Sequence, residues 1–187
     1  IDGSPSVLLS ALFQRTRRLR AGALTFCLPW YNPYRFYSEV CMLDHLSNGR
    51  LELGVGRGVS PIESLIFGIT SIEESRQRYR ETLDVFFAAC RTEVLNYNGQ
   101  EIGLHVKPRQ RPYPPLWFPS SNRESIEFTA RHGYHTAFIG KLADCKPFFE
   151  RYRELKVVLI ESGFGWLPAL GWLAWRAGIR HYVGTGS

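Results

Sequence analysis

Short apolar runs alternate with amphipathic segments along this chain, and the alternation predicts strands that are followed by helices. Residues 23–28 are apolar and stop at a proline, which indicates a buried strand. Asn32 and Pro33 then provide a helix cap and a proline at the first helical position, and Gly49 marks where that helix should end. Residues 51–55 form the next apolar run, which predicts a second strand.

The same order continues through the middle of the chain. After a long loop, Ser71 and Glu74 form a capping box, in which a hydroxyl at the cap is followed three residues later by a carboxylate. The dipeptide that begins at Asn98 is Asn-Gly and indicates a turn. Residues 107–115 are rich in proline and predict an extended surface loop, and residues 116–118 predict a short strand.

A second capping box, from Ser121 to Glu124, predicts another helix that ends at Gly133. Residues 136–139 then predict a strand and residues 147–155 a helix. Strand–helix alternation of this kind indicates a parallel α/β sheet with crossover helices. The sheet can be open and doubly wound or closed as a barrel, and periodicity alone favours neither.

Composition narrows the class of protein. The chain has 187 residues, 44% of them hydrophobic and 21% charged, which excludes collagen-like, disordered and coiled-coil proteins. This length falls short of the ~250 residues of a typical complete α/β barrel. Because the chain begins without a methionine or a signal peptide, we expect residues to be missing before Ile1. Four widely spaced cysteines indicate reduced thiols, and we expect a cytoplasmic protein without a membrane span.

The first candidate site is the predicted strand exit at Gly56, Arg57 and Gly58. Ligands of parallel α/β folds bind at the C-terminal ends of strands. Glycines there allow a flat or phosphorylated ligand to approach the backbone, and an arginine fork can bind phosphate. The alternative is a tight turn with a surface arginine.

Two helix starts are the other candidates. Ser121, Asn122 and Ser125 place short hydrogen-bonding side chains where free backbone N–H groups attract an anion, although simple helix capping explains the same residues. Arg76 stands in the first turn of its helix, where a cation opposes the helix dipole. Either a phosphate or the neighbouring Glu73 and solvent can compensate that charge.

Other chemistry is not indicated. The net charge of +6 favours anionic ligands in general, but no aromatic residues alternate with basic ones as in a base-stacking surface. The arginine cluster in residues 15–20 is typical of a solvated helix end. The histidines do not follow a metal-binding spacing, and the sequence contains neither a nucleophile elbow nor a Walker A motif.

Residues 39–58 carry a more specific pattern. An acidic residue is followed by Leu-Asp, then by Ser-x-Gly-Arg, and then by a strand that ends in Gly-x-Gly-x-Gly. This pattern resembles the bacterial luciferase-like flavin-dependent monooxygenase family, and the proline-rich residues 108–115 and the Ala-Arg-His-Gly of residues 130–133 continue the resemblance. It covers roughly residues 5–154.

The resemblance implies a (β/α)8 TIM-type barrel of parallel strands, here partial or truncated, that binds reduced FMN or the deazaflavin F420. Carried over to this sequence, it implies that the flavin ring lies beside the strand exits and that the phosphate is bound nearby. The ring would be bordered by Leu28, Pro29 and Gly56, with Gly58 in the same turn; the phosphate would be held by Arg57 and Arg76, with Ser121, Asn122 and Ser125 as further donors. Several family members carry Ser where this chain has Asn122.

The resemblance also implies an activity. FMN-dependent members use oxygen to oxygenate an aldehyde, alkane or sulfonate-type substrate, whereas F420-dependent members transfer hydride. A homodimer and a flavin reductase that supplies reduced flavin are the implied partners, and no catalytic acid or base can be assigned. The alternative is a non-catalytic partial barrel or subunit with weak or no flavin binding.

Further expectations concern single segments of the chain. We divide the chain into a luciferase-like segment, residues 1–155, and a divergent tail, residues 156–187. A short block of the tail resembles the amidohydrolase family related to aminocarboxymuconate-semialdehyde decarboxylase, without that family's metal ligands, and residues 157–160 can form one more strand. In the luciferase-like segment we expect Asp44 to pair with Arg50, and Glu39 to lie on a dimer-facing helix.

Overall fold

The computed structural model describes residues 3–120, 122–138 and 141–161. The chain divides into two compact units. The first unit comprises Ile1–Pro119 and Tyr134–Ala137, and the second comprises Ser120–Gly133 and Phe138–Ser187.

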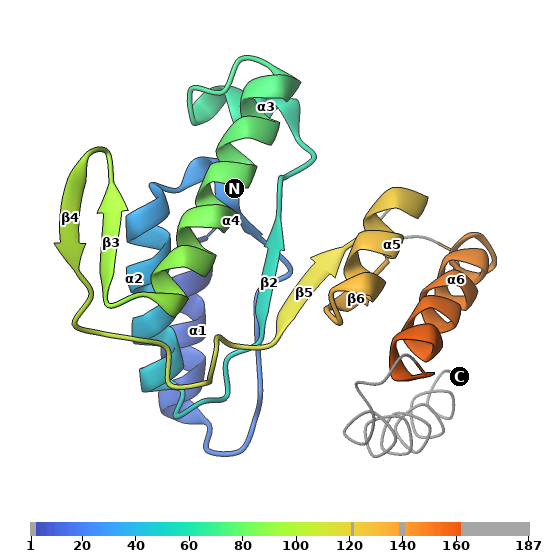
Figure 1. Cartoon of the computed structure of the whole chain (residues 1–187), viewed down its shortest axis with the longest axis horizontal. Coiled ribbons are helices and arrows are strands. Elements are labelled where there is room, and N and C mark those ends of the chain that lie inside the picture. The colour runs from blue at the N-terminus through green and yellow to red at the C-terminus, as the bar shows by residue number, and fades with distance from the viewer. Residues whose placement is uncertain (1–2, 121, 139–140, 162–187) are drawn as a thin grey trace. The chain divides into compact units, whose positions relative to one another are not determined.

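Helices and strands alternate along the described residues, as the sequence predicts (Figure 1). The helices are α1 (Pro5–Arg15), the 3-10 helix η1 (Leu28–Trp30), α2 (Pro33–Leu46), α3 (Pro61–Ile66), α4 (Ile72–Arg91), α5 (Arg123–Arg131) and α6 (Leu142–Glu161). The strands are β1 (Phe26–Cys27), β2 (Leu53–Gly56), β3 (Val94–Tyr97), β4 (Gln100–Gly103), β5 (Leu116–Pro119) and β6 (His135–Ala137).

The main sheet is parallel throughout, which confirms the predicted α/β class. Its strand order is β1-β2-β5-β6, so the strands are neighbours in chain order once the β3–β4 hairpin is set aside. Parallel pairing brings Cys27 opposite Gly56 and Leu53 opposite Leu116. Eight strands close a TIM-type barrel. The described residues supply four parallel ones, so closure of a barrel stays a prediction.

Close packing of β2 explains one of its glycines. A Cβ atom at Gly54 would lie 2.3 Å from the backbone oxygen of Ala23, which is closer than any side chain can approach. The β3–β4 hairpin uses a different property of glycine. Asn98 and Gly99 both have positive φ, 51° and 74°, as the two central residues of a type I′ turn require. This confirms the predicted turn.

Helix caps lie largely where the sequence places them. The side-chain oxygen of Asn32 accepts the N–H of Arg35 at the start of α2 (3.1 Å), and the Ser71 hydroxyl accepts the N–H of Glu74 at the start of α4 (3.1 Å). The Glu74 carboxylate accepts the N–H of Thr70 (2.9 Å) instead of that of the cap residue. The long loop predicted before α4 is partly wrong, because it contains α3.

The second unit corrects two predictions. The cap of α5 is Asn122, whose side-chain oxygen accepts the N–H of Ser125 (2.9 Å); the predicted cap, Ser121, lies outside the described residues. Helix α6 begins before Pro147 and continues to Glu161, so the additional strand predicted for residues 157–160 is wrong. The end of α5 before Gly133 is confirmed, since this glycine has a φ of 71°.

Aromatic side chains form the centre of the first unit's core. Phe26 of β1, Phe36 of α2 and Phe86 of α4 are fully buried. Phe36 lies between the other two, with ring centroids 5.8 Å from Phe26 and 5.6 Å from Phe86. Tilted aromatic pairs contribute about 0.5–1.5 kcal/mol each beyond their buried area. These contacts hold α2 and α4 beside each other (Figure 1), and thereby fix the strand exits.

Candidate functional site

The exits of β1 and β2 lie side by side. Because Cys27 pairs with Gly56, η1 begins immediately beside the glycine turn that follows β2. Leu28 and Pro29 are buried in η1. The structure therefore brings together five predicted site residues: Leu28, Pro29, Gly56, Arg57 and Gly58.

The glycine turn is closely packed against its neighbours at this exit. Gly58 has a φ of 81°, a backbone conformation that favours glycine. A Cβ atom there would lie 3.3 Å from the Trp30 ring and 3.4 Å from Cys27 Sγ, so a side chain would crowd this space. Between the two glycines, the side chain of Arg57 is exposed and makes no hydrogen bond or ion pair with any residue that the structure describes. Its guanidinium is thus available to an anion.

Arg76 lies on α4, the helix that packs against η1. The Thr82 hydroxyl donates to the carbonyl oxygen of Leu28 (3.4 Å), so α4 packs against η1. Arg76 precedes Thr82 by less than two helical turns. Its side chain is 56% exposed, and the guanidinium pairs with Glu73 at 3.5 Å, which is one of the alternatives that the sequence left open.

The remaining predicted residues belong to the second unit. The side-chain oxygen of Asn122 accepts two bonds from Ser125, one from the N–H (2.9 Å) and one from the hydroxyl (3.0 Å). This oxygen is therefore used by the cap, whereas the amide N–H groups of Asn122 remain as potential donors. Ser121 lies outside the described residues. The structure joins Asn122 and Ser125 to each other but does not place them with Arg57.

Sequence reasoning missed an aromatic pair beside the exits. Trp30, the last residue of η1, stacks on Phe67 with ring centroids 4.7 Å apart and an interplanar angle of 9°. The indole N–H of Trp30 is buried and has no hydrogen-bond partner within the described ranges. A buried donor without a partner is costly, so a bound group that accepts this hydrogen bond would gain affinity. The only sequence signal for Trp30 was its position directly after the predicted exit.

Cys27 was also missed as a neighbour of the exit. Burial raises the pKa of its thiol above the ordinary value of 9.0; a hydrogen bond with Thr25 opposes this shift and the charge of Glu63 adds to it. The thiol is therefore neutral at physiological pH. A neutral thiol borders a ligand as a small apolar group and is a poor nucleophile.

The predicted ion pair between Asp44 and Arg50 is wrong. Asp44 is fully buried, and its carboxylate accepts the backbone N–H of Gln110 (2.7 Å) and the side-chain amide of the same residue (2.8 Å). Arg50 donates instead to the carbonyl oxygens of Phe13 (3.1 Å) and Leu19 (3.0 Å). A loop distant in sequence thus supplies two donors to the carboxylate, and both charged groups serve the fold.

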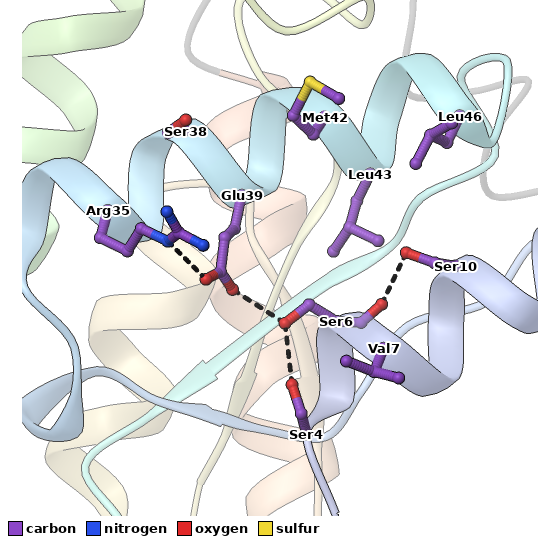
Figure 2. Close-up of a pocket in the computed structure, with 10 residues that line it drawn as sticks. All are labelled: Ser4, Ser6, Val7, Ser10, Arg35, Ser38, Glu39, Met42, Leu43 and Leu46. Atoms are coloured by element: carbon purple, nitrogen blue, oxygen red, sulfur yellow. Dashed lines mark hydrogen bonds and ion pairs between the residues drawn. The ribbon is translucent and has the colours of Figure 1, made fainter.

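A groove of about 500 Å³ lies between α1 and α2 (Figure 2). Glu39 lines it and accepts hydrogen bonds from Ser6 (2.8 Å) and Arg35 (3.0 Å). Apolar side chains on both helices are exposed along it, with Val7 70% and Met42 52% accessible. The groove therefore combines apolar and polar side chains, and the carboxylate of Glu39 already accepts hydrogen bonds from residues of the same chain.

The described residues contain neither a membrane-spanning helix nor a cluster of metal ligands. No helix in the described part is long and apolar enough to cross a membrane. Within the same ranges, no three His, Cys, Asp or Glu residues gather closely enough to hold a metal ion.

Comparison with known structures supports the fold. The monooxygenase RslO1 from Streptomyces bottropensis superimposes with a TM-score of 0.74 at 26% identity, over 84% of this chain and 50% of that one. The oxygenating constituent of 3,6-diketocamphane monooxygenase from Pseudomonas putida, solved with FMN, gives a TM-score of 0.70 over 87% of this chain and 49% of that one. At 19% identity the second likeness shows the fold alone.

Sequence comparison identifies the family. Protein y4wF of Sinorhizobium fredii is 39% identical over 156 residues, which are 81% of this chain and 45% of that protein. The oxygenase component of flavin-dependent trigonelline monooxygenase from Acinetobacter baylyi is 27% identical over 140 residues, 71% of this chain and 38% of that one. This chain thus spans half or less of these relatives, and the amidohydrolase resemblance of its tail stays a prediction. The model of the luciferase-like monooxygenases matches residues 2–156, and the chain belongs to that family.

Proposed function

We propose that this chain forms the flavin-binding part of a flavin-dependent monooxygenase that acts on a small organic substrate. FMN is the proposed cofactor, and F420 is the alternative. A relative that is named a flavin-dependent monooxygenase and a neighbouring fold solved with FMN support this choice. The observation that carries the proposal is an exposed Arg57, between two glycines at a strand exit, that has no partner among the described residues.

The residues at this exit have the chemistry that a flavin site needs. The lack of side chains at Gly56 and Gly58 lets the backbone approach Thr25, Trp30 and Cys27 closely, and the buried N–H of Trp30 lacks a partner among the described residues. Leu28 and Pro29 supply an apolar border for a flat ring. An isoalloxazine ring needs both an apolar surface and a few hydrogen-bond donors.

Phosphate binding is proposed for Arg57 and Arg76. Arg76 would exchange its contact with Glu73 for the phosphate, and the cost of this exchange is small because both side chains of the pair are more than half exposed. Ser121, Asn122 and Ser125 are the proposed further donors, from the helix start that is favourable for anions.

The bound flavin would supply the redox chemistry: activation of oxygen by FMN, or hydride transfer by F420. The residues of the chain would bind and orient it. The neutral Cys27 thiol and the Trp30–Phe67 pair would keep the exit apolar and exclude water from it. We assign no proton transfer to any residue.

The proposal extends to partners and location. Because one relative is an oxygenase component, a separate reductase is the proposed source of reduced flavin. The groove between α1 and α2 is the proposed contact of a homodimer. The four cysteines are free thiols, as in a reducing cytoplasm.

A second candidate is a partial barrel without catalytic activity. It is favoured by the length of the chain, which spans half or less of its relatives. Such a protein would bind flavin weakly or not at all, and would not turn over a substrate.

Titration with oxidised FMN, reduced FMN and F420 separates the candidates. Arg57→Ala should weaken FMN binding by about 1.5–3 kcal/mol, the contribution of a hydrogen bond to a charged group. Arg17→Ala, which removes an exposed arginine outside the proposed site, is the matched control and should leave the affinity unchanged. Saturable binding that only Arg57→Ala weakens supports the flavin site. Absence of binding to all three ligands supports the second candidate.

A further inference from the structure

A second cavity, of about 350 Å³, lies at the opposite end of the strands from the glycine turn. It borders the loop from β4 to β5, which passes near the lower end of α4 in Figure 1, whereas β2 leads towards α3 at the upper edge. Five side chains that are cationic or can become so line it: His45, His105, Lys107, Arg109 and Arg111. Four of them occupy every second position of residues 105–111, which is the side-chain period of an extended chain.

Hydrogen bonds to α2 hold this loop in place. The Tyr37 hydroxyl donates to the carbonyl oxygen of Val106 (2.8 Å), and Nε2 of His45 donates to that of Lys107 (2.8 Å). Asp44 accepts the N–H of Gln110 (2.7 Å). Each anchor comes from α2, and together they fix the backbone on both sides of Arg109. The basic side chains therefore project from an ordered backbone, which lowers the entropic cost of binding a ligand.

The positive charge of this cavity is only partly neutralised within the described residues. Arg109 and Arg111 are exposed, and no carboxylate of the described chain lies within ion-pair distance of either. The nearby Asp44 carboxylate is already bonded to Gln110. Lys107 donates to the carbonyl oxygens of Ala89 (2.9 Å) and Thr92, and its ammonium pairs with Glu93 at 3.9 Å. The charge available to a ligand therefore comes from the two arginines. Like charges that are held together favour an anion.

We propose that this cavity binds the phosphate group of a small molecule, at a site separate from the proposed flavin site. Two guanidinium forks and the His105 imidazole match the several oxygen atoms of phosphate better than the two of a carboxylate. The volume exceeds that of inorganic phosphate and leaves room for a phosphorylated organic molecule. The inference does not depend on the proposed monooxygenase activity.

Titration with inorganic phosphate, followed by NMR of the arginine Nε–Hε groups, tests this site. Acetate and chloride at the same ionic strength are the reference anions, and adenosine 5′-monophosphate tests whether an organic phosphate binds more tightly. Phosphate should shift the signals of Arg109 and Arg111 with one saturable curve. The double variant Arg109→Gln/Arg111→Gln should weaken binding roughly tenfold or more.

The matched control is Arg15→Gln/Arg153→Gln. It removes the same charge from two exposed arginines that line neither cavity, and it should bind phosphate as the unchanged chain does. Arg109→Lys/Arg111→Lys should restore part of the affinity, which separates loss of charge from loss of folding. Equal shifts with acetate and chloride, or equal weakening by both glutamine variants, would overturn the proposal. Loss of flavin binding alone would leave it intact.

Discussion

Asp44 shows how one buried charge can organise a distant loop. A carboxylate that loses all contact with water is stable only when its oxygen atoms accept hydrogen bonds. Both oxygens of Asp44 do so, from the backbone and the side chain of Gln110, and the same amide also donates to the carbonyl oxygen of Leu51 (2.9 Å). The residue therefore joins the end of α2, the start of β2 and the proline-rich loop.

We predict that Asp44→Asn lowers the free energy of unfolding by about 1–3 kcal/mol, because the new amide group faces the N–H donors of Gln110 and leaves buried polar atoms unpaired. Urea denaturation followed by circular dichroism measures this loss. Asp84→Asn is the control, since that carboxylate is exposed on α4 and should contribute less than about 0.5 kcal/mol. Equal stability of the two variants would contradict the role of Asp44.

At the scale of elements, the start of α5 combines two roles that a variant can separate. Asn122 caps the helix through its oxygen, and its N–H groups are the proposed phosphate donors. We predict that Asn122→Asp preserves the cap and weakens FMN binding roughly tenfold, because a carboxylate still accepts the Ser125 N–H but repels a phosphate.

Thermal unfolding and FMN titration of the same protein distinguish these effects. Asn122→Ala is the companion variant, and it should lose about 1 kcal/mol of stability as well as affinity. If Asn122→Asp binds FMN as tightly as the unchanged chain, this helix start is only a cap.

Elements that depend on neighbouring residues were predictable from the sequence, and those that depend on distant contacts were not. The caps at Asn32 and Ser71 follow local rules that act within one helical turn. The short helix α3 was missed, although Ser60 before a proline is a local start signal. The partner of Asp44 and the stack of Trp30 on Phe67 were missed because tertiary packing decides them.

The same distinction applies to the candidate site. The glycines and Arg57 stand out because their residue types are unusual at a strand exit, and parallel pairing brings consecutive exits together. Arg57 has no carboxylate partner in the part of the chain that the structure describes, whereas Arg76 pairs with Glu73. The sequence could not distinguish the two arginines, since each depends on which carboxylates the fold brings near.

At the scale of the whole molecule, exposed apolar surface favours association. Val7, Met42 and Leu46 are 70%, 52% and 44% exposed beside the groove between α1 and α2 (Figure 2). We predict that the chain forms a dimer in sedimentation velocity experiments as its concentration rises. Met42→Asp should shift the equilibrium towards monomer, because a dimer contact there would bury its charge.

Ile62→Asp provides the comparison for this variant. Ile62 lies on α3, is 71% exposed and does not line the groove, so the same new charge should leave the dimer unchanged. A monomer at every concentration, or equal effects of both variants, would contradict the predicted contact.

The bond between Asp44 and Gln110 also has a consequence for the time course of synthesis. The two residues are separated by 66 positions. Strand β2 likewise pairs with β5, which is synthesised much later. At a synthesis rate of about 5–20 residues per second, the carboxylate precedes its partner by several seconds. During that interval α2 cannot bury Asp44 at low cost, and the first part of the sheet lacks its third strand. The chain therefore completes its core late, when the proline-rich loop leaves the ribosome.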